Sequence, residues 1–234
     1  MMYQHKVSRM PAALLPPDES ERSDLLASLK ILDTAPEPIF DQVTRLTSRL
    51  LGVPIALFSL VDVDRQWFKS RVGIDVQETP REHAFCAHAI LQTVPLVVPD
   101  ATADSRFSDN PLVTGDPNIR FYAGVPIRTT GGLALGTLCA IDSKPHQLSD
   151  DQLESLSDLA DIITKEIQYR ETLTLAREDA ERSGEVLARS EARFRTVFDL
   201  ASIGMAMVAP DGGWLSVNDA LCQIVDIRPM SCIE

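Results

Sequence analysis

A row of residues at alternating steps of three and four runs through the C-terminal half of the chain. Such steps place side chains along one seam of a helix, as in a coiled coil. Ser149 and Gln152 form a capping box, so a helix is expected over 149–198, with a length of about 70 Å. That length predicts a rod between two modules. The row comprises Leu159, Ile162, Glu166, Tyr169, Leu173, Ala176, Ala180, Ser183, Leu187, Ser190, Phe194 and Val197.

The first part of this row has a second interpretation. Up to about Tyr169, an apolar helix face can be explained as the cover of a neighbouring sheet. The stretch from 173 to 197 has no sheet left to cover, and it favours a parallel homodimer through residues 159–197. Glu166, Ser183 and Ser190 are polar positions in the row, and we expect them to hold the helix pair near a balance between two registers.

Charge and composition exclude several classes of partner. The 234 residues carry a formal net charge of -12 at pH 7, which argues against nucleic acid and anionic membrane partners because both require clustered Lys and Arg. Neither a transmembrane run nor the apolar segment of a secretory signal is found. The cysteines have no CxxC spacing, and three lie in apolar stretches, which is typical of free thiols in a reducing cytoplasm. They are Cys86, Cys139, Cys222 and Cys232.

Strand and helix patterns flank the long helix on both sides. Apolar segments at 54–61, 65–72, 121–127 and 133–141 predict an antiparallel sheet in an α+β domain over 20–148, after a flexible tail at 1–19. Beyond the long helix, 203–208 and 214–217 predict a hairpin, and Asn218 predicts a helix cap. Two strands and one helix cannot bury a core alone, so residues 199–234 are expected to be an incomplete module.

Seven ordered motifs run through the first module. They are LKILDTAPEPIFD (29–41), RQWFKS (65–70), FCAHAI (85–90), VPDA (98–101), DSRFSDN (104–110), IRFYAGVPI (119–127) and LGTLCAID (135–142). Together they make this module resemble the GAF family. The resemblance implies an antiparallel sheet flanked by helices, and a sensor of small molecules or light of the kind that precedes bacterial histidine kinases and diguanylate cyclases. It also implies a ligand cavity over one face of the sheet. Its candidate residues are Trp67, Lys69, Phe85, Cys86, His88, Asp104, Arg106, Phe107, Arg120, Tyr122 and Cys139.

The segment at 190–225 is similar to the start of a PAS domain. The motifs EARFRTVF (191–198), IGMAMVAPDG (203–212) and WLSVNDALC (214–222) carry this similarity, which ends at Asp226. The fold class expected for the whole chain is therefore a GAF-type sheet flanked by helices, a long C-terminal coiled-coil helix, and a partial PAS hairpin in a truncated PAS domain at 199–234.

Cys86 and His88 raise the question of a bound cofactor. Some GAF domains attach a linear tetrapyrrole through a cysteine adjacent to a histidine, but Ala87 separates the two residues here. On a helix expected over 82–91, they point to different sides, whereas Cys86 and His83 share a face. A buried thiol beside a hydrogen-bonded histidine is favoured over bilin or haem attachment, redox sensing and metal binding. No cofactor and no metal are predicted.

Two further pairs of candidate residues can be interpreted from their charge or their position in a strand. Arg106 and Arg120 either bind an anionic ligand or pair with carboxylates such as Asp100 and Asp104, and the second role is favoured. Trp67 and the next residue, Phe68, alternate along a strand, so they are expected on opposite faces of the sheet.

No catalytic motif is recognised. The chain has no Gly-rich nucleotide-binding motif and no cyclase signature, and alanines follow His83 and His88 where a kinase phosphoacceptor has an acidic residue. The sequence predicts a cytoplasmic input module, not an enzyme, which binds an unknown small molecule or senses redox state. It would relay that state through a dimeric helix to a histidine kinase or diguanylate cyclase outside this chain. The alternatives are a structural dimerisation module and a chromophore-binding photoreceptor.

Overall fold

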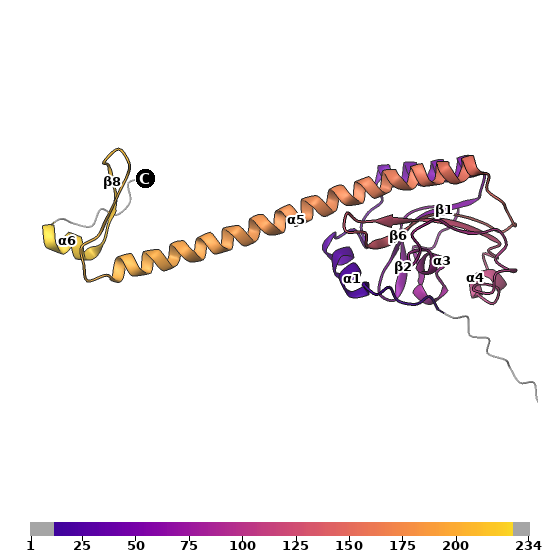
Figure 1. The fold of residues 1–234 in the computed structure, drawn as a ribbon, viewed down its shortest axis with the longest axis horizontal. Coiled ribbons are helices and arrows are strands. Elements are labelled where there is room, and N and C mark those ends of the chain that lie inside the picture. Colours follow the sequence, from indigo (N-terminus) through magenta and orange to yellow (C-terminus); the bar gives the residue numbers. More distant parts are fainter. Residues whose placement is uncertain (1–11, 227–234) are drawn as a thin grey trace, which may run out of the picture. The chain divides into compact units, whose positions relative to one another are not determined.

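The computed structural model describes residues 12–226. The chain divides into two compact units, Met1–Thr174 and Leu175–Glu234. Helix α5, Asp150–Leu200, contributes to both units (Figure 1). Every helix described between residues 12 and 226 is too short or too polar to span a lipid bilayer.

The first unit is built on an antiparallel sheet, as the sequence predicts, and the sheet has six strands. The strands lie in the order β3-β2-β1-β6-β5-β4. Adjacent strand segments pair as β1 with β2 and as β5 with β6, and the β1–β6 pairing joins these two halves. The strands are β1 (Ile55–Val61), β2 (Arg65–Val72), β3 (Glu78–Pro80), β4 (Leu96–Val98), β5 (Phe121–Arg128) and β6 (Ala134–Asp142).

Helices cover both faces of this sheet. Figure 1 shows the start of α5 along one face, with α3 and α4 on the other. The helices are α1 (Glu19–Ser28), α2 (Pro38–Leu51), the 3-10 turn η1 (Arg81–His83), α3 (Phe85–Ala89) and α4 (Pro111–Thr114). Proline in the first turn of α2 and Gly52 at its end, with a φ of 69°, fix the bounds of that helix.

Burial on both faces explains the apolar run of β1, which Ser59 alone interrupts. Successive side chains of a strand point to opposite faces. Trp67 therefore enters the core with α1, α2 and α5, and Phe68 enters the core with α3. The expected placement of these two residues is confirmed, and both side chains are buried. Ala13, which falls in the predicted tail, packs against the α3 side of the sheet.

Helix α5 begins at the predicted capping box. The Gln152 backbone N–H donates to Ser149 Oγ, and the Ser149 N–H donates to Gln152 Oε1. The face that α5 buries on the sheet follows steps of three and four, but it differs from the predicted seam. Ile162 and Tyr169 of the seam are 43% and 61% exposed. The buried residues are Leu156, Leu159, Ala160, Ile163 and Ile167. Of the seam residues up to Tyr169, only Leu159 is therefore explained by packing of α5 against the sheet.

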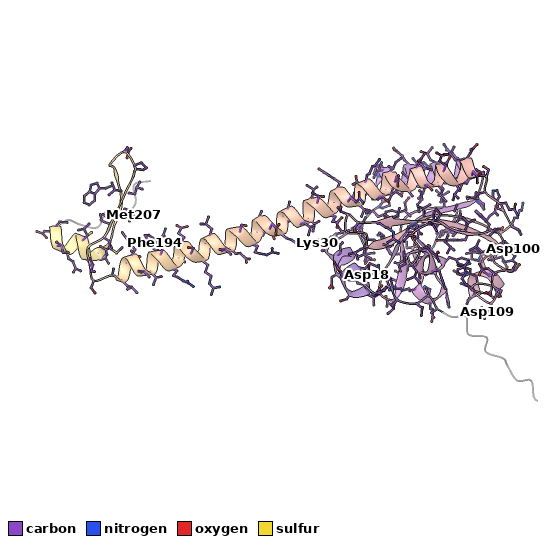
Figure 2. The ribbon with its side chains drawn as sticks, viewed as in Figure 1. Asp18, Lys30, Asp100, Asp109, Phe194 and Met207 are labelled. Atoms are coloured by element: carbon purple, nitrogen blue, oxygen red, sulfur yellow. The ribbon has the colours of Figure 1, made fainter. Side chains whose placement is uncertain are left out.

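The second unit contains the expected hairpin and cap. Strands β7 (Ala206–Val208) and β8 (Trp214–Val217) pair, and α6 (Asp219–Val225) follows. Asn218 Oδ1 accepts the Leu221 N–H, and its Nδ2 donates to the Phe198 and Ile203 carbonyls. The hairpin exposes apolar side chains, and Figure 2 marks Met207 on it and Phe194 on α5. Assignment of this unit to a PAS domain stays a prediction, and residues 227–234 lie outside the described range.

Candidate functional site

The face of the sheet beneath α3 carries a compact group of aromatic, hydroxyl and thiol side chains. We call it the aromatic–thiol cluster: Phe85, Cys86, His88, Phe107, Tyr122, Thr137 and Cys139. Thr137 and Cys139 share this face because they are two residues apart on β6. The Phe85 and Phe107 rings stack with centroids 4.0 Å apart, and the Phe85 and Tyr122 centroids are 5.2 Å apart. Side chains thus occupy the space where the sequence predicts a ligand cavity.

Two thiols meet at the centre of the cluster. The Sγ atoms of Cys86 and Cys139 lie 3.9 Å apart. Thr137 Oγ1 donates to Cys86 Sγ at 3.0 Å, and Tyr122 Oη donates to it at 3.4 Å. A Cβ on Gly124 would lie 2.1 Å from Tyr122 Oη, so glycine at this position leaves room for the hydroxyl to reach the thiol.

These contacts give the two thiols different acidities. Burial raises the pKa of Cys86, but hydrogen bonds with Cys139, Thr137 and Tyr122 outweigh it and lower the pKa from 9.0 to about 7. The hydrogen bond with Cys86 and burial raise the pKa of Cys139. The contacts therefore favour the thiolate at Cys86 over the thiolate at Cys139. Such a pair combines a sulfur nucleophile with a second thiol in contact.

His88 is the member of the cluster whose environment favours the neutral imidazole. Its ring meets the edge of Phe107 at 4.9 Å. Burial lowers the pKa of His88, and the nearby Arg106 lowers it further. Nε2 is buried and has no hydrogen-bond partner within residues 12–226, so the expected hydrogen-bonded histidine is not found at this atom. The single helix expected over 82–91 is also absent: η1 ends at extended Ala84, so His83 and Cys86 do not share a helical face.

The two candidate arginines are engaged by the protein itself. Arg106 Nε and Nη2 donate to the Asp104 carboxylate at 2.9 and 2.6 Å, which matches the favoured carboxylate pairing. Arg120 Nη1 instead donates to the carbonyl oxygens of Val113 and Ile119 at 2.8 and 3.0 Å. Both guanidinium groups therefore fix the loops beside the cluster, and neither is left as an open clamp for an anion.

Trp67 and Lys69 lie on the opposite face of the sheet from the cluster. Lys69 Nζ binds Glu37 Oε1 at 2.7 Å, Thr34 Oγ1 at 2.5 Å and the Ala35 carbonyl at 2.8 Å. Its side chain is fully buried. The eleven candidates from the sequence therefore do not line one cavity: six belong to the cluster, three to its flanking loops, and two to the other face.

An ion-pair network on that other face ties α5 to the domain. We call it the Glu37 latch: Lys69, Glu37, Arg170 and Glu166. Arg170 forms a two-point ion pair with Glu37 and binds Glu166 with its Nε at 2.9 Å. The Arg170 hydrogen bonds, reinforced by Lys69, outweigh burial and lower the pKa of Glu37 from 4.5 to about 2. One turn of α5 therefore fastens the helix to both the α1–α2 loop and β2.

A second contact fixes α5 to the β5–β6 hairpin. The Glu171 carboxylate accepts the Thr130 N–H at 2.8 Å, and Gln168 Nε2 donates to the Arg128 carbonyl. Sequence reasoning missed Glu37, Arg170 and Glu171 because no local pattern pairs residues 133 positions apart. It did identify Glu166 as a polar position in the seam, and the structure gives that residue a partner.

A surface pocket of about 280 Å³ is lined by Ala87 of α3, by Arg81 and by Ala12 from the N-terminal segment. None of the residues of the aromatic–thiol cluster is among its lining residues. Among residues 12–226, no group of three or more His, Cys, Asp or Glu side chains is arranged to hold a metal ion.

Comparison with known proteins identifies the first unit. A cyclic di-GMP phosphodiesterase of Pseudomonas aeruginosa is 44% identical over 131 residues, which is 56% of this chain and 22% of that protein. The chain therefore spans about a fifth of this curated relative.

Solved structures show similarity at low identity. The GAF domain of an Acinetobacter phosphoenolpyruvate-protein phosphotransferase is 14% identical, with a TM-score of 0.49 over 68% of this chain and 97% of that one. A domain of a sensor histidine kinase protein described as putative, from Sinorhizobium meliloti, is 16% identical, with a TM-score of 0.45 over 64% and 99%. The GAF domain family model matches residues 35–167, more than half of the sequence, and the chain therefore belongs to the GAF family.

Proposed function

We propose that this chain is a cytoplasmic input region of a signalling protein, and that the state of its GAF domain is passed through α5 to an output domain outside the chain. The observation that carries the proposal is the double role of α5. Its first turns are buried in the GAF core, and its later turns present an exposed apolar row. A change in the packing of the core therefore acts directly on α5, whose sequence continues beyond the GAF domain.

The Glu37 latch and the Glu171 contact support mechanical coupling. They lie at the last buried turns of α5, where Ile167 is fully buried and Tyr169 is 61% exposed. A helix fixed at two points, by Glu37 and by the Thr130 N–H, moves with the domain that holds it. The GAF fold itself indicates a sensory role, and we assign no enzymatic step and no cofactor to this chain.

We further propose that α5 pairs with a second copy as a parallel homodimer through residues 159–197. Leu173, Leu187 and Phe194 of the row are 51%, 69% and 47% exposed, and apolar residues at these steps form coiled-coil seams. Ion pairs such as Arg177–Glu181 lie outside the row, so these charged side chains do not occupy seam positions. This arrangement places two GAF domains at one end of the helix pair.

Disulfide trapping tests the dimer. In a cysteine-free background, Leu187→Cys is expected to cross-link efficiently to its copy, because a seam residue meets itself in a parallel pair. Glu185→Cys, which lies off the seam, is the matched control and should cross-link slowly. Equal rates for the two variants, or a monomer in analytical ultracentrifugation, would refute the dimer.

Coupling is tested by the same cross-link. Ile163→Ala removes a fully buried contact of α5 with the sheet, and Asp161→Ala removes an exposed side chain that lies outside the row. We expect the first change to alter the Leu187→Cys cross-linking rate at least about twofold and the second to leave it nearly unchanged. If Ile163→Ala leaves the rate unchanged in a folded domain, no relay operates.

The relative from Pseudomonas aeruginosa supports an output in cyclic-nucleotide signalling. Its name, a cyclic di-GMP phosphodiesterase, adds a third output class to the histidine kinase and the diguanylate cyclase. The second unit, which we assign to the start of a PAS domain, would lie between the GAF domain and that output.

A structural dimerisation module is the second candidate. The observation in its favour is the filled aromatic–thiol cluster, where Phe107, Tyr122 and Cys139 are each fully buried. A filled cluster also gives no support to a chromophore-binding photoreceptor. Native mass spectrometry of the purified chain discriminates between the two functions. A retained small molecule supports sensing by ligand. A chain without a ligand, in which Ile163→Ala does not alter the Leu187→Cys cross-linking rate, supports the structural module.

A further inference from the structure

Cys86 and Cys139 are buried thiols that different elements hold in contact. Cys86 belongs to the short helix α3, and Cys139 belongs to the central strand β6. We propose that this pair is the stimulus site of the GAF domain, where hydrogen peroxide or another small hydroperoxide oxidises the two thiols to a reversible disulfide. This inference rests on the proposed sensory function and names the class of stimulus.

Two neighbouring hydroxyl groups favour Cys86 as the nucleophile that attacks the peroxide. Thr137 Oγ1 at 3.0 Å and Tyr122 Oη at 3.4 Å both direct a hydroxyl donor to its sulfur, which stabilises the thiolate. Because both thiols are buried, this step requires an oxidant as small as a hydroperoxide.

The reaction balances with the two thiols and one hydroperoxide. The Cys86 thiolate attacks the terminal peroxide oxygen, the O–O bond breaks, and the departing oxygen takes the proton that Cys86 released. Cys86 becomes a sulfenic acid, and water or an alcohol leaves. Cys139 then attacks the Cys86 sulfur, the S–O bond breaks, and the Cys139 proton leaves with the hydroxide as water. Two electrons pass from the two thiols to the peroxide.

Disulfide formation draws the two thiols together and strains the packing around α3. The Sγ–Sγ distance must fall from 3.9 Å to about 2.05 Å, and α3 carries Phe85, which stacks on Phe107. The neighbours of Cys139 on β6, Leu138 and Ala140, face the core that holds the start of α5. A change at Cys139 therefore reaches the helix across a single strand.

Peptide mapping tests the site. The 234-residue chain with Cys222→Ser and Cys232→Ser is reduced, treated with hydrogen peroxide, and digested under non-reducing conditions. We expect a Cys86–Cys139 linked peptide that a phosphine reductant abolishes. In the additional Cys139→Ser variant, dimedone should label Cys86. If both thiols stay reduced in the folded chain under a tenfold excess of peroxide, the proposal is overturned.

A conservative variant guards against misfolding of the cysteine mutants. Thr137→Val keeps the shape of the side chain but removes the donor to Cys86 Sγ, and it should slow disulfide formation at pH 7 about fivefold. Thr47→Val is the matched control, because Thr47 is equally buried but donates to the Val43 carbonyl on the other face. Equal rates for both variants would contradict the role of the thiolate.

Hydrogen exchange of α5 separates this proposal from the proposed function. If the disulfide forms and exchange of residues 159–174 changes, both are supported. If it forms and α5 is unchanged, the redox site is supported and the relay fails. If no disulfide forms although Ile163→Ala alters α5, the relay stands and the redox site is overturned.

Discussion

Replacement of Glu37 by glutamine is the sharpest probe of how α5 is fastened to the domain. Glu37→Gln keeps the size and hydrogen-bonding shape of the side chain but removes its charge. The Lys69 ammonium, with a fully buried side chain, then loses its carboxylate partner, and Arg170 loses its two-point ion pair. A buried cation without a counter-ion is costly, so we expect the free energy of unfolding to fall.

The pKa of Glu37 sets the size of this effect. A fall from 4.5 to about 2 corresponds to about 3 kcal/mol of stabilisation of the charged form. The Glu37 side chain is 31% exposed, so solvent screening reduces this figure. We therefore expect Glu37→Gln to destabilise the GAF domain by about 2 kcal/mol at pH 7.

The pH dependence follows from the sign of the shift. Because the pKa is lower in the folded state, the stabilisation is complete above about 4.5, the unfolded value, and is lost as the pH falls to about 2. The stabilities of the wild-type chain and Glu37→Gln should therefore converge across this window.

Urea unfolding followed by Trp67 fluorescence measures this difference in a Trp214→Phe background. Trp67 is buried in the same core, at 4% exposure, so it reports on the domain that the latch stabilises. Glu181→Gln is the matched control, because it breaks an exposed Arg177 ion pair on α5 and should cost less than about 0.5 kcal/mol. If Glu37→Gln is as stable as this control at pH 7, the latch contributes nothing and the reasoning is refuted.

Three further substitutions test other parts of the structure. Phe107→Ala should destabilise the domain by about 3–5 kcal/mol in urea unfolding, because it leaves a cavity where a fully buried ring stacks on Phe85. A loss below about 1 kcal/mol would show that the cluster is loosely packed. Gly124→Ala should destabilise by about 1–3 kcal/mol, because its Cβ meets Tyr122 Oη, and Tyr122→Phe should recover part of this loss; additive effects in the double mutant would contradict the clash. Ser149→Ala should cost about 1 kcal/mol and speed hydrogen exchange in the first turn of α5, since Ser149 Oγ accepts the Gln152 N–H; unchanged exchange would mean that the capping box is not formed.

Local patterns of the sequence determined the elements of this protein. The capping box at Ser149 predicts the start of α5, and the alternation of Trp67 and Phe68 predicts their opposite faces, because both depend on neighbours within a few residues. The seven motifs likewise identify the GAF domain. The single helix expected around Cys86 was wrong, since extended Ala84 separates η1 from α3.

The tertiary structure alone decided which candidate residues meet. Lys69 and Cys86 are both plausible cavity residues in the sequence, yet Lys69 points from β2 to the face opposite the one that α3 and Cys86 cover. Glu37 and Arg170 pair across 133 positions, and Cys86 meets Cys139 across 53, because folding brings distant segments into contact. The apolar seam of α5 can be predicted from the spacing of residues in α5 itself. Which face of α5 is buried depends instead on how the helix packs against the sheet. Helical periodicity is local and can be read directly, but long-range contacts depend on packing of the whole core.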